Sequence, residues 1–171
     1  MDIFPISLKL QQQPCLIVGG GHIAYRKAVL LQKAGAVISV ISPEILPELL
    51  EIVEQSQGQY VQSNFQDEIN IRVYRLVIAA TDDQATNQNV FHLCELENVL
   101  VNSVDDPPHC RFMVPAIIDR SPLVVSIATN GQSPVLSRQI RTQLEAAIPH
   151  GMGKLAEFSG KWRSAVKAKI V

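Results

Sequence analysis

The sequence has little of several features that would define a class of protein on their own. Its 171 residues include only three cysteines, Cys15, Cys94 and Cys110, which form no CxxC pair. Scattered cysteines in odd number argue against a disulfide scaffold and suit a reducing compartment, so we expect a cytoplasmic protein without a metal site and interpret the three as packing residues. The apolar runs are strand-sized, well short of the roughly 20 residues that span a bilayer. The N-terminus also lacks the basic start of a signal peptide, so we expect no membrane partner.

Charged residues are also few, at 18% against 47% hydrophobic residues, a balance that allows a real core and argues against disorder. The net charge of −1 conceals an asymmetry. Residues 1–119 carry 7 Lys/Arg and 14 Asp/Glu, whereas residues 120–171 carry 8 Lys/Arg and 2 Asp/Glu. The basic region favours an anionic partner, although a solvated basic helix face explains it equally well. Nucleic acid is not among the partners we expect.

What the sequence does contain is a regular alternation of strand-like and helix-like segments up to about residue 113. This alternation is typical of βαβ units with right-handed crossovers, so we predict the α/β class, with a Rossmann-type parallel sheet in a domain of residues 1–113. The expected strands are 14–18, 36–41, 59–63, 75–81 and 100–104, and the expected helices are 22–34, 42–57 and 84–97.

The pattern changes after Pro107-Pro108. Segments 111–118 and 122–129 predict a strand pair joined through Asp119-Arg120-Ser121. Ser133-Pro134 then has the residues of a helix start, and this helix is expected to reach about Ile148. We predict a small α+β region over 114–149. From about Gly153 a basic helix follows, and we interpret 150–171 as the start of a helical C-terminal part that is truncated here.

Gly19-Gly20-Gly21-His22-Ile23-Ala24 has the form G-x-G-x-x-A and lies between a predicted strand and a predicted helix. Gly19 permits a tight turn, Gly21 lets the backbone approach a pyrophosphate, and the small Ala24 lets the helix pack closely on the strand. The helix N-terminus supplies amide donors and positive potential to the phosphates. The motif therefore predicts a dinucleotide site at Gly19, Gly21, His22 and Ile23.

The second strand ends at Ser42-Pro43-Glu44 without the Asp that usually binds the ribose. Glu44 or the backbone of 42–44 can take that place, but Glu44 is equally explained as an acidic residue in the first turn of a helix. No Lys or Arg stands at this turn to hold a 2′-phosphate, which favours NAD over NADP. Thr81 and Asp82 follow the fourth strand and are further candidates for the cofactor cleft.

Asp105 follows the fifth strand, at the same predicted edge of the sheet. A carboxylate here would face whatever lies beside the nicotinamide, where it can act as a base or bind a cation. Asp105 and Asp106 are also explained as a turn-forming pair before two prolines. Asp106 is expected on the opposite side of an extended backbone.

Three blocks of the sequence together resemble the N-terminal module of siroheme synthases, the precorrin-2 dehydrogenase and sirohydrochlorin ferrochelatase family. They are LIVGGGHIAYRKAVLLQKAGA, VIAATDDQATNQNV and VNSVDDPPHCRFMVPAIIDRSPLVVSIATNGQSPVLSRQIR. The resemblance implies a homodimer, with 114–149 as the dimerisation region. It also implies NAD-dependent conversion of precorrin-2 into sirohydrochlorin, with ferrous iron as a further substrate.

Carried over by position, the resemblance assigns the shared catalytic acid to Asp105 and NAD contacts to His22-Ile23 and Pro43-Glu44. The family often has serine where Thr129 stands, so a role tied to serine itself does not transfer. Because the tetrapyrrole carries many carboxylates, we expect its binding residues in the basic part of the chain. The candidates are Arg120, Thr129, Gly131, Ser133 and Arg138.

Two other hypotheses fit parts of the sequence. A regulatory module that senses NAD would need the glycine loop but not Asp105. A chelatase without dehydrogenase activity would keep Asp105 but not require the glycine loop. The sequence leaves open the metal preference and whether a methyltransferase module follows Val171.

Overall fold

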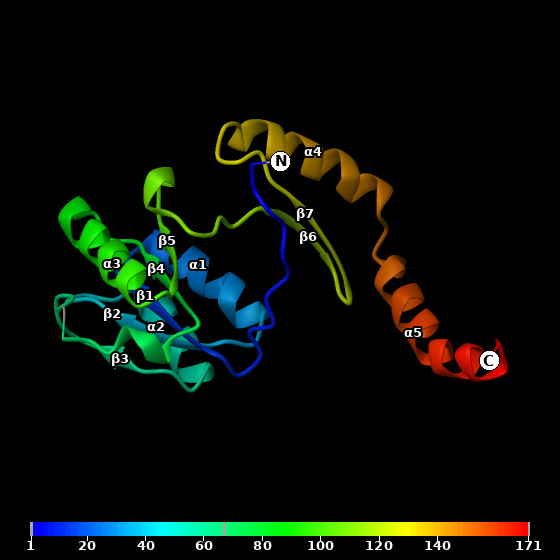
Figure 1. Cartoon of the computed structure of the whole chain (residues 1–171), viewed down its shortest axis with the longest axis horizontal. Coiled ribbons are helices and arrows are strands. Elements are labelled where there is room, and N and C mark those ends of the chain that lie inside the picture. Colours follow the sequence, from blue (N-terminus) through cyan, green and yellow to red (C-terminus); the bar gives the residue numbers. More distant parts are fainter. Residues whose placement is uncertain (1, 67, 171) are drawn as a thin grey trace. The chain divides into compact units, whose positions relative to one another are not determined.

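A computed structural model describes residues 2–66 and 68–170, and within the last helix it describes no side chains at 164, 165 and 167–170 (Figure 1). Two compact units form the chain. The first comprises Phe4–Phe112, and the second comprises the residues from Met113 onward together with the first three.

The first unit contains a five-stranded parallel sheet in the order β3-β2-β1-β4-β5. This is the strand order of a doubly wound α/β fold, which confirms the predicted Rossmann-type sheet. The strands are β1 Pro14–Val18, β2 Val37–Ile41, β3 Tyr60–Val61, β4 Leu76–Ala79 and β5 Leu100–Ser103. The helices are α1 His22–Lys33, α2 Pro47–Gln55 and α3 Gln84–Leu96, with short 3-10 turns at Ile71–Val73 and Pro107–His109.

Helices cover both faces of this sheet, and each face has its own hydrophobic core. On one face Ile17, Ile38 and Ile78 pack with Ala24 and Ala28 of α1 and with residues of α2. On the other face Leu16, Val18 and Val77 pack with Val90 and Phe91 of α3. Because both faces are covered, the central strands β1 and β4 are apolar along their whole length rather than alternating, as in other parallel sheets.

The predicted start of the second helix at Ser42 is wrong, because α2 begins five residues later at Pro47. Leu46, which precedes this proline, has φ −65° and ψ 138°, the extended conformation that a following proline favours. The helix therefore cannot extend back through Leu46. Residues 42–46 instead run along the edge of the sheet, where they become part of the site described below.

The predicted third strand is shortened to Tyr60–Val61, and the predicted segment 75–81 to Leu76–Ala79. At β3 only two residues pair with β2, through Val40 and Ile41. The chain then leaves the sheet, so Ser63, Asn64 and Phe65 form a loop at its carboxyl edge.

The second unit contains an antiparallel pair, β6 Ala116–Arg120 and β7 Leu123–Ile127, followed by helices α4 Pro134–Ala147 and α5 Gly151–Ile170. The predicted strand pair is confirmed, but its turn lies at Ser121-Pro122 because β6 continues through Arg120. The predicted start of the helix after it is confirmed as well. Ser133 is the N-cap, and its side chain accepts a hydrogen bond from the Leu136 amide at 3.3 Å.

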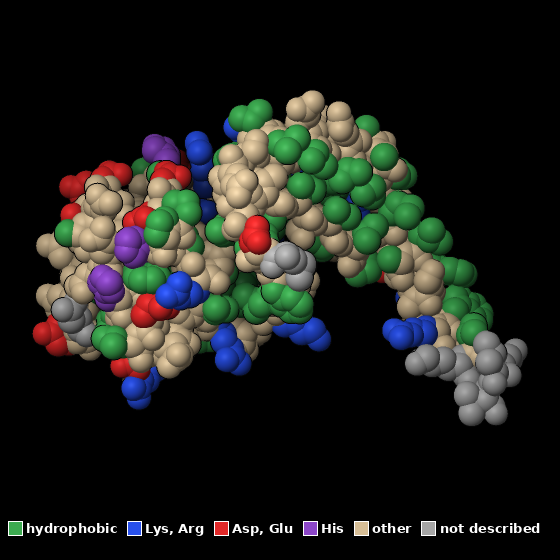
Figure 2. Space-filling view, turned by 45° about the horizontal axis from the view of Figure 1, so that its top comes forward, with side chains coloured by type: hydrophobic (Ala, Val, Ile, Leu, Met, Phe, Trp, Pro, Cys, Tyr) green, Lys and Arg blue, Asp and Glu red, His purple; other side chains and the backbone are tan. Residues whose placement is uncertain are grey.

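Helix α5 presents an exposed apolar stripe at helical spacing, formed by Leu155, Phe158, Trp162 and Val166. Figure 2 shows hydrophobic side chains gathered along this part of the chain. Two of the lysines that make the C-terminal region basic, Lys167 and Lys169, have side chains outside the described residues.

Candidate functional site

The glycine loop joins β1 to α1 in the conformation that its sequence predicts. Gly19 has φ +119°, a value that residues with a side chain rarely adopt, and its amide donates to the Ile41 carbonyl at 2.9 Å. Gly21 precedes α1, and a Cβ atom placed on it would meet no atom within 4 Å. Ala24 is fully buried between helix and sheet. The loop is therefore tight at Gly19, open at Gly21 and closely packed at Ala24.

Gly20, which the motif leaves unspecified, is also required by the fold. A Cβ atom on Gly20 would lie 1.9 Å from the carbonyl oxygen of Glu44, well inside van der Waals contact. The Gly20 carbonyl in turn accepts a hydrogen bond from the Leu46 amide at 3.0 Å. No sequence signal identified this requirement, because it depends on the path of residues 42–46.

Residues 42–46 form the second wall of the site. Ser42 is buried, whereas Pro43 and Glu44 are exposed and line the cleft. Glu44 does not lie in a helical turn, since the acidic residue in the first turn of α2 is Glu48. The explanation of Glu44 as a helix-start residue is therefore wrong, and its position fits a contact with the cofactor.

The third wall follows β4, where Asn87 of α3 fixes the backbone. Its Nδ2 donates to the Thr81 carbonyl at 2.9 Å, and its Oδ1 accepts from the Thr81 amide at 3.2 Å. Asp83 caps α3 by accepting from the amides of Ala85 and Thr86. The Asp83 carboxylate also accepts a hydrogen bond from the Thr86 hydroxyl. This bond makes the largest contribution to lowering the pKa of the Asp83 carboxyl, and the two amide bonds add to it. Asn87 was not identified from the sequence, because nothing in the sequence indicates which group a polar residue within a helix will hydrogen-bond.

These segments enclose a cleft of about 680 Å³ at the carboxyl edge of the sheet. All eight residues predicted to bind the cofactor line it: Gly19, Gly21, His22, Ile23, Pro43, Glu44, Thr81 and Asp82. The loop residues Ser63, Asn64 and Phe65 line it too and were not predicted. A signal was available, because this loop also follows a strand of the parallel sheet.

The cleft suits a dinucleotide on structural grounds. In the described part of the chain no side chain caps the N-terminus of α1, so its first amide groups can bind a phosphate. The open space over Gly21 lets a pyrophosphate approach the backbone. No lysine or arginine is among the described residues that line the cleft, whereas Glu44 is.

Asp105 does not line this cleft but follows the neighbouring strand β5, at the same edge of the sheet. The Val104 amide donates to the Ala79 carbonyl at 2.9 Å, which fastens the loop after β5 to the end of β4. Asp105 is exposed and has φ +58°, in the left-handed region. Asp105 and Asp106 therefore lie in a turn, and the predicted extended backbone at this point is wrong.

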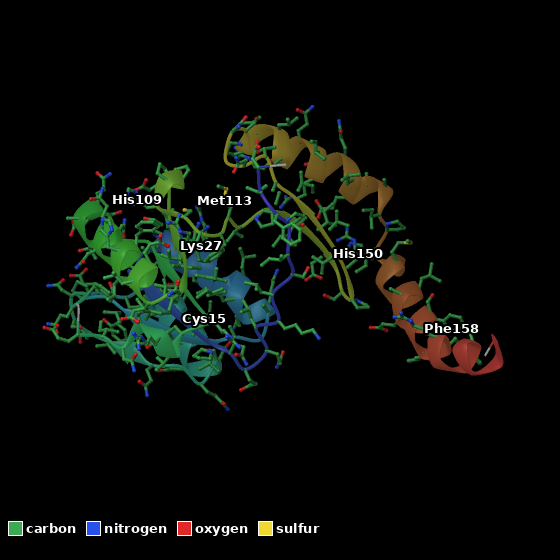
Figure 3. All side chains as sticks on the ribbon, viewed as in Figure 1. Cys15, Lys27, His109, Met113, His150 and Phe158 are labelled. Carbon is green, nitrogen blue, oxygen red and sulfur yellow. The ribbon has the colours of Figure 1, made fainter. Side chains whose placement is uncertain are left out.

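The loop after β5, on which Figure 3 labels His109, is held by hydrogen bonds of its own side chains. Asp106 Oδ2 lies 2.8 Å from Nδ1 of His109, and the His109 ring packs edge-on against Phe91. Cys110 Sγ donates to the Ser103 carbonyl at 3.1 Å. Asp106, His109 and Cys110 are thus occupied within the loop, in contrast to Asp105.

The residues predicted to bind the tetrapyrrole lie in the second unit, where several have structural partners. Arg120 donates to the carbonyls of Ile148 and Asp119. The Thr129 hydroxyl accepts from the Ser133 amide at 3.2 Å and lies 3.1 Å from the Ser137 hydroxyl. Gly131 has φ +75° in the loop between them. Arg138 is exposed, with one long contact of 3.4 Å to the Pro134 carbonyl. Their role toward a substrate remains a prediction.

The strand order, the glycine loop and the cleft at the carboxyl edge together define a Rossmann-type dinucleotide-binding protein. Residues 6–116 match the family model described as "Putative NAD(P)-binding", and the chain belongs to this family. Residues 120–147 match the model described as "Sirohaem biosynthesis protein central". The predicted NAD cofactor is thereby confirmed at the level of the family.

The chain is similar to siroheme synthases over almost all of its length. It is 68% identical to the siroheme synthase of Acinetobacter baylyi over 170 residues, 99% of this chain and 37% of the relative. It is 46% identical to that of Psychrobacter sp., again over 99% of this chain and 35% of the relative. The chain thus spans about a third of the length of these curated relatives. The predicted resemblance to the siroheme synthase family is confirmed.

Among solved structures the chain is similar to SirC, a precorrin-2 dehydrogenase. The TM-score is 0.79 at 26% identity, over 95% of this chain and 79% of SirC. Similarity over this share of both chains includes the second unit as well as the Rossmann unit. Within residues 2–66 and 68–170, no helix has the length and apolar character needed to cross a membrane.

Proposed function

We propose that this chain is an NAD-dependent dehydrogenase that converts precorrin-2 into sirohydrochlorin. The observation that carries the proposal is the position of Asp105, one strand away from a dinucleotide cleft at the same edge of the sheet. The names of the similar proteins, siroheme synthase and precorrin-2 dehydrogenase, support this substrate. A module that only senses NAD would not need a carboxylate at this place.

Different residues of the proposed site serve cofactor binding and proton transfer. The glycine loop and the N-terminus of α1 would hold the pyrophosphate, and residues 42–46, which line the same cleft, would contact the adenosine part. NAD, when bound, accepts the hydride that the macrocycle loses. The oxidation also releases a proton, and we assign its acceptance to the Asp105 carboxylate.

A second activity, the insertion of ferrous iron into sirohydrochlorin, belongs to the same proposal. Metal insertion displaces two protons from ring nitrogens, so a carboxylate that accepts one proton in the oxidation can also assist here. Iron is a substrate in this scheme. Among the described residues no cluster of three or more His, Cys, Asp or Glu side chains is arranged to hold a metal ion. Asp105 is our candidate for the carboxylate in both steps.

The direct test is to mix purified protein with precorrin-2 and NAD and record the absorption spectrum. We expect the spectrum of sirohydrochlorin to appear together with that of NADH. The two products should form in equal molar amounts. Addition of ferrous iron should then give the spectrum of siroheme. NAD binding without any change of the tetrapyrrole would contradict the proposal and favour the sensing role.

The charge of the cleft leads to an expectation about cofactor choice. Since Glu44 lines the cleft and no described lining residue is Lys or Arg, a 2′-phosphate bound beside residues 42–46 would find no cation there and would lie near the Glu44 carboxylate. We expect NAD to bind at least tenfold more tightly than NADP, measured by calorimetry. Glu44→Gln should narrow this ratio, whereas Glu48→Gln, on the first turn of α2, should leave it unchanged. Equal affinity for the two cofactors in the wild type would contradict this assignment.

We also propose that the second unit forms a homodimer. Among the apolar residues of the predicted dimerisation region, Val114, Ile117 and Ile127 are half-buried and Val124 is 56% exposed. The pairing of β6 with β7 places Ile117 and Val124 on one face, whereas Ile127 shares the other face with the buried Ile118. Ile117 and Val124 are therefore the better interface candidates.

The dimer is tested by light scattering at micromolar concentration, where we expect twice the mass of the chain. Val124→Asp places a charge in an apolar contact and should weaken the dimer at least tenfold. Leu96→Asp is the matched control, because Leu96 is a 77% exposed apolar residue at the end of α3 in the other unit. A monomeric wild type, or equal effects of the two variants, would contradict the assignment.

A further inference from the structure

The loop after β3 lines a part of the cleft that neither the pyrophosphate nor the reacting end of the cofactor accounts for. Its residues Ser63, Asn64 and Phe65 line the same cleft as the glycine loop and residues 42–46. Ser63 and Phe65 are half-buried, whereas Asn64 is exposed. The loop therefore combines an aromatic side chain that is held in place with a polar one that a ligand can reach.

The strand order indicates which half of a dinucleotide reaches this loop. β3 lies beyond β2 on one side of β1, whereas β4 and β5 lie on the other side (Figure 1). The glycine loop, after β1, stands between the two sides, and Asp105, the proposed base, follows β5. With the nicotinamide directed toward Asp105, the adenosine half extends past residues 42–46 toward β3. The base at the end of that half then meets the loop after β3.

Three hydrogen bonds join the chain around β3 to the neighbouring wall of the cleft. The Tyr60 hydroxyl donates to the Ser42 carbonyl at 3.1 Å, and the Ser42 amide donates to the Val61 carbonyl at 3.2 Å. The side-chain amide of Gln62 donates to the Pro43 carbonyl at 3.3 Å. The two walls are therefore fastened to each other, so a ligand that spans them meets a preformed surface.

Phe65 offers a base an apolar surface at this wall. Its side chain packs against the hydrophobic core that includes Val18 and Ile41, the last residues of β1 and β2, and it also lines the cleft. Packing against the core restricts the ring, so little conformational entropy remains to be lost when a ligand binds. Contact between an aromatic side chain and the flat face or edge of a purine is favourable.

Asn64 adds groups that can distinguish adenine from other bases. Its side chain lies at the cleft and is exposed, and no hydrogen bond among the described residues involves its amide. A carboxamide has both a donor and an acceptor, and adenine presents the complementary pair, an amino group next to a ring nitrogen. Hypoxanthine has an oxygen in place of this amino group, so it cannot make the same pair of hydrogen bonds.

We propose that the loop after β3 is the adenine-binding wall of the cleft, in which Phe65 packs against the base and the Asn64 amide recognises its amino group. Neither residue is assigned a contact with the pyrophosphate or with the tetrapyrrole. The proposal rests on the place of NAD in this cleft, which is part of the proposed function, and on no property of the tetrapyrrole.

Recognition of the base is tested by calorimetry, without any turnover. We expect the wild type to bind NAD about tenfold more tightly than nicotinamide hypoxanthine dinucleotide, since a lost hydrogen-bond partner has roughly this effect. Asn64→Ala should bring the two affinities within about twofold of each other. Asn70→Ala is the matched control, because Asn70 is an exposed asparagine of the same connection that does not line the cleft. Equal affinities in the wild type, or an unchanged ratio in Asn64→Ala, would overturn the assignment of Asn64.

Phe65 is tested with two fragments of the cofactor, whose binding is followed by NMR. Phe65→Ala should weaken the binding of ADP-ribose about tenfold or more and leave that of nicotinamide mononucleotide, which has no adenine, unchanged. Because Phe65 also packs against the core, Phe65→Leu is the second variant and keeps an apolar side chain there. It should melt near the wild-type temperature and still bind ADP-ribose more weakly. Unchanged binding of ADP-ribose, or an equal loss for both fragments, would overturn the role of Phe65.

These experiments separate the two proposals. A wild type that does not oxidise precorrin-2 refutes the proposed function, whereas calorimetry with the two dinucleotides still decides whether the loop after β3 recognises adenine. An active wild type whose Asn64→Ala and Phe65→Leu variants bind both dinucleotides as the wild type does refutes the adenine-binding wall alone.

Discussion

Gly21→Asp is expected to abolish NAD binding while the protein stays folded. The added carboxylate would point into the space that the pyrophosphate needs, and like charges at such a contact cost several kcal/mol, so affinity should fall on the order of 100-fold or more. The fold should tolerate the change, because Gly21 has φ −88° and a Cβ atom there meets nothing within 4 Å. Aspartate is also a favourable residue at the N-cap of a helix. Calorimetry gives the affinity, and circular dichroism the fold.

The adjacent glycine provides the matched control with the opposite outcome. In Gly20→Ala the new methyl group would lie 1.9 Å from the Glu44 carbonyl oxygen, so the backbone must shift. Overpacking of this kind costs about 1–3 kcal/mol, and the melting temperature should fall. If Gly21→Asp bound NAD like the wild type, or if Gly20→Ala were as stable as the wild type, the geometry assigned to this loop would be wrong.

Asp105→Ala should remove most of the oxidation of precorrin-2 and most of the insertion of iron. Loss of a positioned general base typically lowers a rate by roughly 10²–10⁴-fold. NAD affinity should not change, because Asp105 is not among the residues that line the cofactor cleft. The dimer should persist as well. Rates are measured from the absorption of sirohydrochlorin and siroheme, and binding by calorimetry.

Asp106→Ala is the control for removing a carboxylate from the same turn. Asp106 is half-buried and paired with His109 within the loop, whereas the Asp105 side chain is exposed. Its loss should change the rates by only a few fold. Wild-type turnover in Asp105→Ala would show that Asp105 is only a turn residue, the alternative that its place before two prolines suggests.

The parts of the site that depend on neighbouring residues were predictable from the sequence. The glycine loop needs a tight turn, open space above its backbone and a small residue, all within six positions. Its pattern is therefore visible along the sequence. The carboxyl ends of the strands were predictable too, because parallel strands bring their ends to one edge. This rule placed Thr81 and Asp82 in the cleft.

The parts that depend on distant contacts were not predictable. Gly20 is required by the carbonyl of Glu44, and Asn87 is required by the backbone of Thr81. The predicted start of α2 was wrong because Ser42-Pro43 has the residues of a helix start. The helix actually starts at the second such proline, Pro47.

The contact between the glycine loop and residues 42–46 has a consequence for how this protein can diversify. The two segments are joined through main-chain atoms, by the Gly20 carbonyl with the Leu46 amide and by the close approach of Gly20 to the Glu44 carbonyl. The side chains of Pro43 and Glu44 take no part in this junction. On the proposed assignment of these two residues to the cofactor, we expect substitutions there to change cofactor preference without disturbing the main-chain contacts that shape the glycine loop.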